Sequence, residues 1–432
     1  MVRGAWGNDS RQIGHPRMKT AVSFFSKAVR TPETRVVLAI GVQAAAAGFF
    51  ALLTARWLGP SSRGIVVVFM TTSSFLMLVG SLGVSTGSRV LLNGSPPLGL
   101  TSLLKQARIL SLFHLVTAST VGLFVLAKTG GMPTLWIGVI FVPFAAVQLF
   151  SYFQREALHG IGRHRSAVYG EVLSFTIMTA AVLLLQVMGR LNLVAVCLVI
   201  LGGALAQTVF LATRLSSEEQ SPPFASFSLR QLIRFSAPAL FTTLGQAFVI
   251  RGDRLVLGLL AGAAPVGVYG GAATFTEVLW LIPGAVAQVA FRRASVTGTR
   301  REGATARRIT LLVTALACLV IVAFTRPLIT MLLGPAYSEA VGMAYILIPA
   351  ALPMASYQLD AAVLNGLGRL SQSRNATTVG SVVLLAGCLV TIPRYGAYGA
   401  AWSSLVAYTA MAALAHVYLR RLEVRDTHAI GG

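Results

Sequence analysis

Apolar residues in this chain gather into long runs that short polar segments separate. Twelve of these runs are long enough to cross a membrane as helices, because about 20 helical residues span roughly 30 Å of hydrocarbon. The pattern therefore predicts an all-α polytopic membrane protein with about twelve transmembrane helices. They are expected at 36–57, 64–84, 109–127, 135–153, 169–188, 191–212, 232–260, 266–291, 309–325, 341–364, 376–392 and 397–419.

A polar segment divides the twelve runs into two sets of six. It covers 213–230 and contains Pro222 and Pro223, which favour a linker over a helix. We therefore expect two six-helix bundles joined on the cytoplasmic side. The predicted organisation is a cytoplasmic basic N-terminal arm (1–34), a first bundle (35–212), the linker (213–230), a second bundle (231–421) and a cytoplasmic tail (422–432).

Two short motifs recur about 200 residues apart. The pattern Leu-x-Gly-x-Gly-Arg occurs at 158–163 and again at 364–369, an offset of 206 residues. The glycine-containing turn at 59–64 has a looser counterpart at 262–267, at an offset of 203 residues. Two unrelated motifs at nearly one offset predict duplication of a six-helix unit. Because six is even, both copies would face the same way in the membrane.

Basic residues are distributed unevenly between alternate loops. Of the 35 Lys and Arg residues, 27 fall on the side that holds both termini in the twelve-helix arrangement. By the positive-inside rule that side is the cytoplasm, so both termini are expected there. The net charge of +22 would suggest nucleic acid in a soluble protein, but here it follows from the basic loops. We therefore expect membrane lipid, and no nucleic acid, as a partner.

Composition narrows the class further. The chain is 55% hydrophobic and only 11% charged, too little charge to cover a soluble protein of 432 residues. The three cysteines, Cys197, Cys318 and Cys388, lie in apolar runs and have no metal-ligand spacing. We expect no disulfide, no metal and no cofactor. The first 34 residues lack the apolar core of a cleaved signal peptide.

Several motifs resemble those of the oligosaccharide and polysaccharide flippases of the multidrug/oligosaccharidyl-lipid/polysaccharide (MOP) exporter superfamily. Similarity runs over nearly the whole chain, and the order and spacing of the motifs carry it. The segments are Ala-Arg-Trp-Leu-Gly-Pro-Ser-Ser-Arg-Gly at 55–64, Leu-Arg-Gln-Leu-Ile-Arg-Phe-Ser-Ala-Pro at 229–238, Asp-Arg-Leu-Val-Leu-Gly at 253–258, Val-Gly-Val-Tyr-Gly at 266–270, Leu-Gly-Pro-Ala-Tyr at 333–337 and Pro-Arg-Tyr-Gly-Ala-Tyr-Gly-Ala-Ala at 393–401.

This resemblance implies a MATE-like pair of six-helix bundles around a central cavity in a bacterial cell membrane. It implies a transporter of polysaccharide biosynthesis whose cargo is an undecaprenyl-pyrophosphate-linked oligosaccharide, and no enzyme. The family's lipid II flippases carry two more helices, which this sequence lacks, so a polysaccharide repeat unit is the expected cargo. Other polysaccharide assembly proteins are implied as partners.

Charged residues inside the runs are candidates for the transport site, because intramembrane charge is costly and faces a cavity or a partner. Arg56, Arg251 and Arg254 are the candidates for binding pyrophosphate, since a guanidinium matches phosphate oxygens and stays ionised. The alternative is that they reach the interface or form structural ion pairs. Asp253 and Glu277 are candidate acids for coupling or for structural pairing with the helix at 232–260. No catalytic residue is expected.

Two other functions stay open at this point. A drug/cation antiporter of the same superfamily would have an acidic cavity, which the arginines near mid-chain argue against. A membrane-embedded glycosyltransferase, polymerase or ligase would have a long outer loop or paired carboxylates outside the membrane. The one adjacent acidic pair, Glu218 and Glu219, falls in the predicted cytoplasmic linker.

Overall fold

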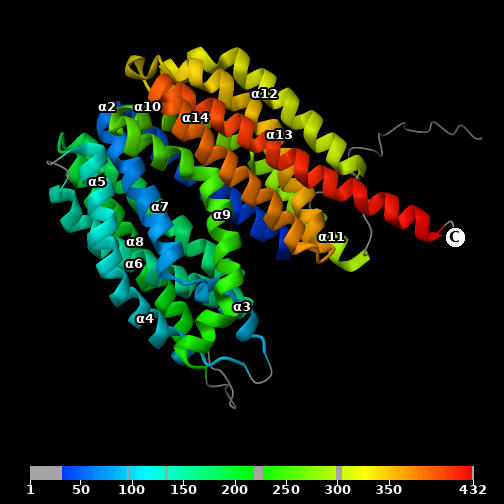
Figure 1. Ribbon diagram of the computed structural model, residues 1–432. Helices are drawn as coiled ribbons and strands as arrows, with labels where there is room; N and C mark the ends of the chain where they lie inside the picture. The colour runs from blue at the N-terminus through cyan, green and yellow to red at the C-terminus, as the bar shows by residue number, and fades with distance from the viewer. Residues whose placement is uncertain (1–31, 95–96, 132–134, 218–226, 298–303, 431–432) are drawn as a thin grey trace, which may run out of the picture.

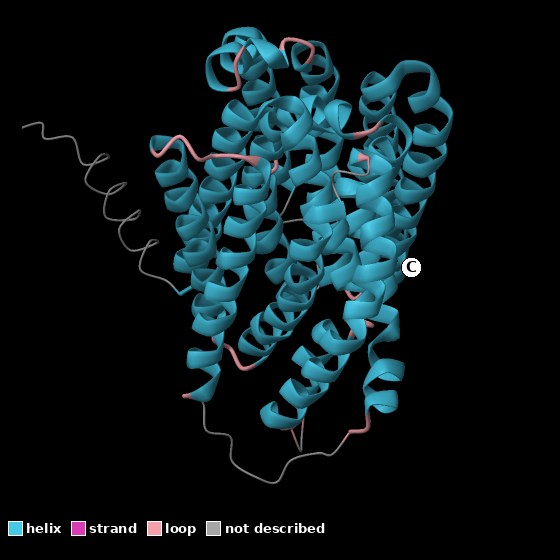
Figure 2. Ribbon diagram, turned by 90° about the vertical axis from the view of Figure 1, so that its left-hand side faces the viewer, coloured by secondary structure: helices cyan, strands magenta, loops and turns pink. Residues whose placement is uncertain are grey.

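The computed structural model describes residues 32–94, 97–131, 135–217, 227–297 and 304–430, and helices carry nearly all of them (Figure 2). Most of the predicted arm at 1–34 lies outside these ranges, as does the middle half of the predicted linker at 213–230, namely 218–226. The helices are α2 (Pro32–Gly80), α3 (Val84–Leu91), α4 (Leu100–Thr117), α5 (Leu123–Gly130), α6 (Leu135–Gly160), α7 (His164–Val187), α8 (Leu193–Ser216), α9 (Leu229–Ala261), α10 (Ala263–Leu279), α11 (Leu281–Thr297), α12 (Ala304–Leu332), α13 (Ala340–Gly366) and α14 (Leu370–Ile430).

The all-α polytopic class predicted from the sequence is confirmed. Among the described residues, eight helices are long and apolar enough to cross a membrane, or up to ten if each of two bent helix pairs is one span. Two of the eight, Gly41–Gly80 and Leu370–Leu422, have 40 and 53 residues. At 1.5 Å per residue each is about twice the length that one crossing needs.

Both of these long helices contain a glycine with a non-helical backbone. Gly59 in α2 has φ 75° and ψ 171°, and Gly396 in α14 has φ 54° and ψ −132°. Positive φ is accessible to glycine without the steric cost that a Cβ brings. These two glycines therefore mark where each long helix changes direction, at the boundaries predicted between runs.

The two bent pairs have their breaks near prolines. Leu229–Ala237 and Ala239–Ala261 meet at 55°, on either side of Pro238. Ala263–Leu279 and Leu281–Val296 meet at 42°, and Pro283 follows this break. A proline has no backbone N–H to donate within a helix, which explains why these helices bend rather than run straight.

Glycines with positive φ recur in pairs along the chain. Eight of the nine positive-φ glycines of the described residues fall into four pairs whose members are 203 to 207 residues apart. The repetition extends the two sequence motifs to four turns and supports an internal duplication. The pairs are Gly59 with Gly262, Gly131 with Gly334, Gly162 with Gly368, and Gly189 with Gly396.

The two Leu-x-Gly-x-Gly-Arg motifs adopt the same helix ending. The backbone N–H of Arg163 donates to the Leu158 carbonyl at 2.8 Å, and that of Arg369 donates to the Leu364 carbonyl at 2.8 Å. In both motifs the second glycine has positive φ, which closes the last helical turn. The motif therefore encodes a helix stop that both halves of the chain share.

Helix α9 lies between two groups of helices. Figure 1 shows α4, α6 and α8 on one side of it and α11 to α14 on the other. Its residues contact α14 on one side and α2 and α3 on the other. Side chains on opposite faces of α9 therefore face different groups of helices.

A close contact joins α2 and α10 beside the paired turns at Gly59 and Gly262. A Cβ added to Gly64 would lie 1.8 Å from the Ala263 carbonyl oxygen, and one added to Gly267 would lie 1.9 Å from the Pro60 carbonyl oxygen. Only glycine permits such a backbone approach at either position. The two repeat-related turns thus pack directly against each other.

Candidate functional site

One cavity of about 270 Å³ lies among α2, α6, α7, α8 and α9. Its charged lining residues are Arg155, Glu171 and Arg251, and amides such as Gln43 and Gln148 line it as well. Charged side chains at membrane depth are costly unless they meet water or a partner. This cavity is therefore a candidate binding site for a polar ligand.

Arg251 reaches the cavity from α9 and is solvent-accessible. Among the described residues it makes no hydrogen bond and no ion pair. It interacts electrostatically with Glu277, Arg254 and Asp253 at longer range. Its guanidinium is thus free to donate to a ligand, and a guanidinium matches the oxygens of a phosphate.

The other cavity charges are already balanced. Arg155 forms an ion pair with Glu171 through Nη1, and its Nε lies 3.8 Å from Glu156 Oε1. Arg89, whose side chain is half-exposed, pairs with Glu156 in turn. Two cations and two anions alternate along this chain of contacts. Arg251 consequently supplies the uncompensated positive charge on the described lining of the cavity.

Arg254 points to a different partner, one turn further along α9. Its Nη2 binds Glu277 Oε1 on α10 in a largely buried ion pair. Arg63 and Arg251 also interact electrostatically with Glu277. Glu277 therefore lies amid three arginines, and pairing with α9 is its principal contact.

Asp253 faces away from both arginines, into the packing of α9 against α10 and α14. Its Oδ2 accepts hydrogen bonds from the Tyr269 hydroxyl and from Ser404 Oγ, the latter at 2.9 Å, while Oδ1 accepts from the Arg254 N–H at 2.7 Å. The side chain is buried. Three donors satisfy this carboxylate, so it joins three helices.

Arg56 does not lie with the other candidate arginines. Its Nη1 donates to the carbonyl of Met331, and the Leu332 carbonyl lies 3.4 Å away. These carbonyls end α12, where a positive charge is favourable. The structure thus brings Arg251, Arg254, Asp253 and Glu277 together, while a pyrophosphate contact by Arg56 stays a prediction.

Two residues of this region were not predicted from the sequence. Arg155 falls just beyond the predicted run at 135–153, yet α6 continues to Gly160 and carries it into the cavity wall. Arg63 falls in a predicted loop, but it lies in the helical part of α2 that follows Gly59, and one of its guanidinium nitrogens is buried without a partner among the described residues. Both belong to helices longer than their apolar runs, which hydropathy alone underestimates.

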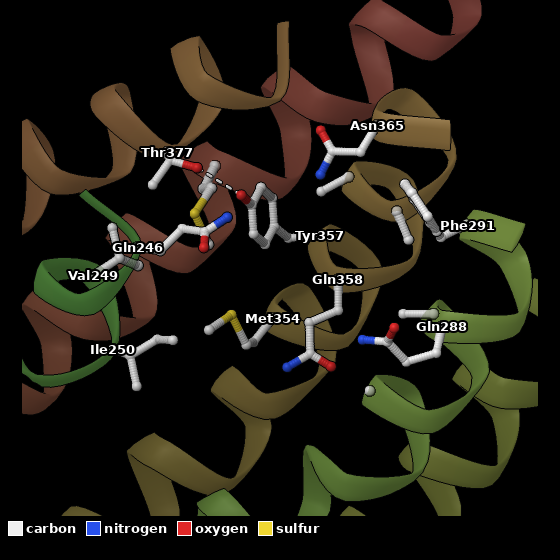
Figure 3. A pocket seen from close by; sticks show the side chains of 15 residues that line it. Gln246, Val249, Ile250, Gln288, Phe291, Met354, Tyr357, Gln358, Asn365 and Thr377 are labelled. Carbon is white, nitrogen blue, oxygen red and sulfur yellow. Dashed lines mark hydrogen bonds between the residues drawn. The ribbon is translucent and has the colours of Figure 1, made fainter. Parts of the chain in front are cut away.

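A second cavity, of about 420 Å³, lies on the other side of α9, among α9, α11, α13 and α14. Figure 3 shows the amides of Gln246, Gln288 and Gln358 directed into it from three helices. The Tyr357 hydroxyl and Thr377 Oγ1 are 2.6 Å apart at its wall. The described lining of this cavity contains no charged side chain.

Helix α9 forms a wall of both cavities within two turns. Gln246, Val249 and Ile250 line the second cavity, whereas Arg251 lines the first. A helix is about 10 Å across with its side chains, so the two spaces are neighbours. The site therefore has a cationic part and a neutral polar part on opposite faces of one helix.

Comparison with known protein families finds a match over part of the chain. Residues 134–342 match the family described as polysaccharide biosynthesis protein. Over this segment the chain is similar to that family, and the match covers just under half of the 432 residues. The matched segment includes α6 to α12, and with them Arg155, Arg251, Arg254 and Glu277. A comparison with curated proteins finds no match.

Several solved structures are similar to this chain in fold. A structure titled lipid II flippase MurJ, inward closed conformation, is similar with a TM-score of 0.73 at 14% identity, over 90% of this chain and 87% of that one. An inward-facing multidrug resistance MATE family transporter of the MOP superfamily gives 0.67 at 16% identity, over 88% and 94%. An outward-facing structure of such a transporter gives 0.62 at 16% identity, over 91% and 96%.

These likenesses establish a MurJ/MATE-like fold. The chain therefore has the fold that its resemblance to the MOP superfamily implies, and it is a multi-pass membrane protein.

Proposed function

We propose that this protein is a flippase that moves an undecaprenyl-pyrophosphate-linked oligosaccharide, the repeat unit of a polysaccharide, from the inner to the outer leaflet by alternating access. The headgroup crosses through the cavities beside α9, and the prenyl chain stays in lipid. The family match and the likeness to a lipid II flippase support a lipid-linked sugar as the cargo class.

One observation carries the proposal: Arg251 presents a guanidinium, unpaired among the described residues, to a cavity inside the membrane fold. Without a ligand such a charge is costly at this depth, so its position favours an anionic cargo. The pyrophosphate is the anionic part of a lipid-linked sugar. Arg254 lies beside it, but its charge is balanced by the ion pair with Glu277, so Arg251 is the guanidinium left to contact the cargo.

The topology we propose has twelve spans in two six-helix bundles, 35–212 and 231–421, with both termini in the cytoplasm. The breaks at Gly59 and Gly396 divide α2 and α14 into two spans each, and each bent pair counts as one. Four repeated glycine turns support the duplication.

The conformation we assign is inward-facing. Both cavities lie near the Leu-x-Gly-x-Gly-Arg turns, since Arg155 and Asn365 line them, and these turns adjoin the basic loops. The Gly64–Gly267 contact closes the opposite side. Alternating access then requires this contact to open.

Cation antiport fits this site less well. A cationic drug would need an unpaired acid in the cavity, but Glu171 and Glu277 are in ion pairs and Asp253 is buried among hydroxyl groups. In the cavity described here, the free charge is positive.

The test uses purified protein in vesicles with undecaprenyl pyrophosphate that carries N-acetylglucosamine. A soluble galactosyltransferase outside the vesicles modifies only the sugar in the outer leaflet, so the accessible fraction rises as the probe flips. We expect flipping by the natural protein and a loss of tenfold or more for Arg251→Ala, because charged hydrogen bonds contribute about 1.5–3 kcal/mol. Arg394→Ala, an exposed arginine away from the cavities, is the matched control.

Normal flipping by Arg251→Ala at equal protein levels would refute Arg251 as the pyrophosphate contact. A natural protein that leaves the accessible fraction at the level of empty vesicles would refute the flippase function itself.

A further inference from the structure

The lining of the second cavity suits a neutral, hydroxyl-rich ligand. It combines three glutamines, Asn365, Thr377 and the hydroxyl of Tyr357 on four helices. Each amide offers both donors and an acceptor, and each hydroxyl offers both roles. A lipid tail would offer the amides no hydrogen bonds, and a charged ligand would find no counter-charge on the described lining.

One of these groups lacks a partner in the protein. The amide oxygen of Gln358 is buried and accepts no hydrogen bond among the described residues. Buried polar atoms are nearly always hydrogen-bonded, so an orphaned one at a cavity wall calls for a partner from outside the chain. Gly284 leaves room beside it, since a Cβ there would come within 3.6 Å of this oxygen.

The size and place of the cavity fit a headgroup component. Its volume of about 420 Å³ lies in the usual range for small-molecule sites. Gln246, on its wall, and Arg251, in the cationic cavity, are five residues apart on α9, a rise of about 7.5 Å. The axial rise and the helix width of about 10 Å together separate the amides from Arg251 by about 12 Å, roughly the length of a pyrophosphate with one attached sugar, so one headgroup reaches both by passing around α9.

We propose that the cavity lined by Gln246, Gln288, Gln358 and Tyr357 binds the uncharged sugar next to the pyrophosphate, so that the two faces of α9 read two parts of one headgroup. This inference rests on the proposed flippase function. It assigns a cargo class: the sugar attached to the pyrophosphate is neutral and makes hydrogen bonds to amides.

Binding measurements on the full-length protein in lipid nanodiscs test the proposal with three probes. These are undecaprenyl pyrophosphate alone, the same lipid with N-acetylglucosamine, and the same lipid with glucuronic acid. The natural protein should bind the N-acetylglucosamine probe at least tenfold more tightly than the bare lipid. The glucuronic acid probe should gain less, because no cation compensates its carboxylate.

Two leucine variants then locate the sugar contact. Gln358→Leu and Gln288→Leu should each reduce the advantage of the N-acetylglucosamine probe by about fivefold, the effect of one hydrogen bond, and leave the affinity for the bare lipid unchanged. Gln288 is exposed to the cavity, so its variant serves even if Gln358→Leu fails to fold. Gln186→Leu, at the exposed end of α7, is the matched control and should change neither affinity.

Arg251→Ala provides the contrast, because it should weaken all three probes by the same factor. The proposal is overturned if the leucine variants also weaken all probes equally, or if glucuronic acid gives the tighter complex. A natural protein that binds the bare lipid but gains nothing from the sugar overturns this inference and leaves the flippase function standing. Failure to bind any of the lipids overturns both.

Discussion

The contact between α2 and α10 offers a direct test of the transport cycle through Gly64→Ala. The new Cβ would lie 1.8 Å from the Ala263 carbonyl oxygen, whereas such contacts are essentially never shorter than 3.0 Å. The two helices must therefore move apart by about 1.2 Å for alanine to fit. Gly267→Ala poses the same demand from the other helix, against the Pro60 carbonyl at 1.9 Å.

On the inward-facing assignment proposed above, the strain acts on the state in which this contact is closed. Overpacking of this kind costs about 1–3 kcal/mol in well-packed proteins. If the outward-facing state separates the two helices, that state escapes the cost. The equilibrium should then shift towards it by roughly 5- to 150-fold.

Spin labels at Val187 and Tyr395 would report the shift, since both side chains are exposed at the ends of α7 and of the first part of α14. Pulsed electron spin resonance gives the distance distribution between them, and Gly64→Ala should enrich the longer distances. Gly48→Ala is the matched control on the same helix, because nothing lies within 4 Å of its added Cβ. An unchanged distribution in both Gly64→Ala and Gly267→Ala would refute the contact as the closure of the outer side.

Four further substitutions test the packing around the site. Gly162→Ala and Gly368→Ala should each lower the melting temperature in detergent by a similar amount, since each forces alanine to positive φ at about 1–2 kcal/mol; a large effect at one position alone would contradict their equivalence. Tyr269→Phe should destabilise the protein by about 1–3 kcal/mol, because the buried Asp253 loses a donor. Unfolding that matches the natural protein would argue against this hydrogen bond. Glu277→Gln should reduce transport by leaving Arg254 without its counter-charge, and full activity in the vesicle assay would remove the ion pair from the mechanism.

Much of this fold is predictable from hydropathy and glycine placement. The apolar runs predict helices because the bilayer leaves backbone groups no partner except each other. The repeated Leu-x-Gly-x-Gly-Arg pattern predicts two equivalent helix stops, and both occur at Gly162 and Gly368 with the same hydrogen bonds. The sequence alone does not reveal the pairs that contain Gly131 and Gly189, because their surrounding residues differ between the halves while the backbone geometry recurs.

The candidate site is less predictable. The sequence placed Arg251, Arg254 and Glu277 in adjacent helices, but it could not show that Arg254 pairs with Glu277 and leaves Arg251 free. That outcome depends on the rotation of α9 relative to α10. The amide cavity carries even less signal, because single glutamines such as Gln288 and Gln358 are unremarkable until packing brings them together.

Because α9 carries Gln246 and Arg251 on one rigid rod, their separation stays constant while the surrounding walls rearrange. Helix α9 then fixes the distance between the contact to the phosphate and the contact to the adjoining sugar. Sugars beyond the first would extend past α9 into water, where no contact with the protein distinguishes them. On this proposal the protein distinguishes its cargoes by the first sugar and tolerates differences in the later sugars.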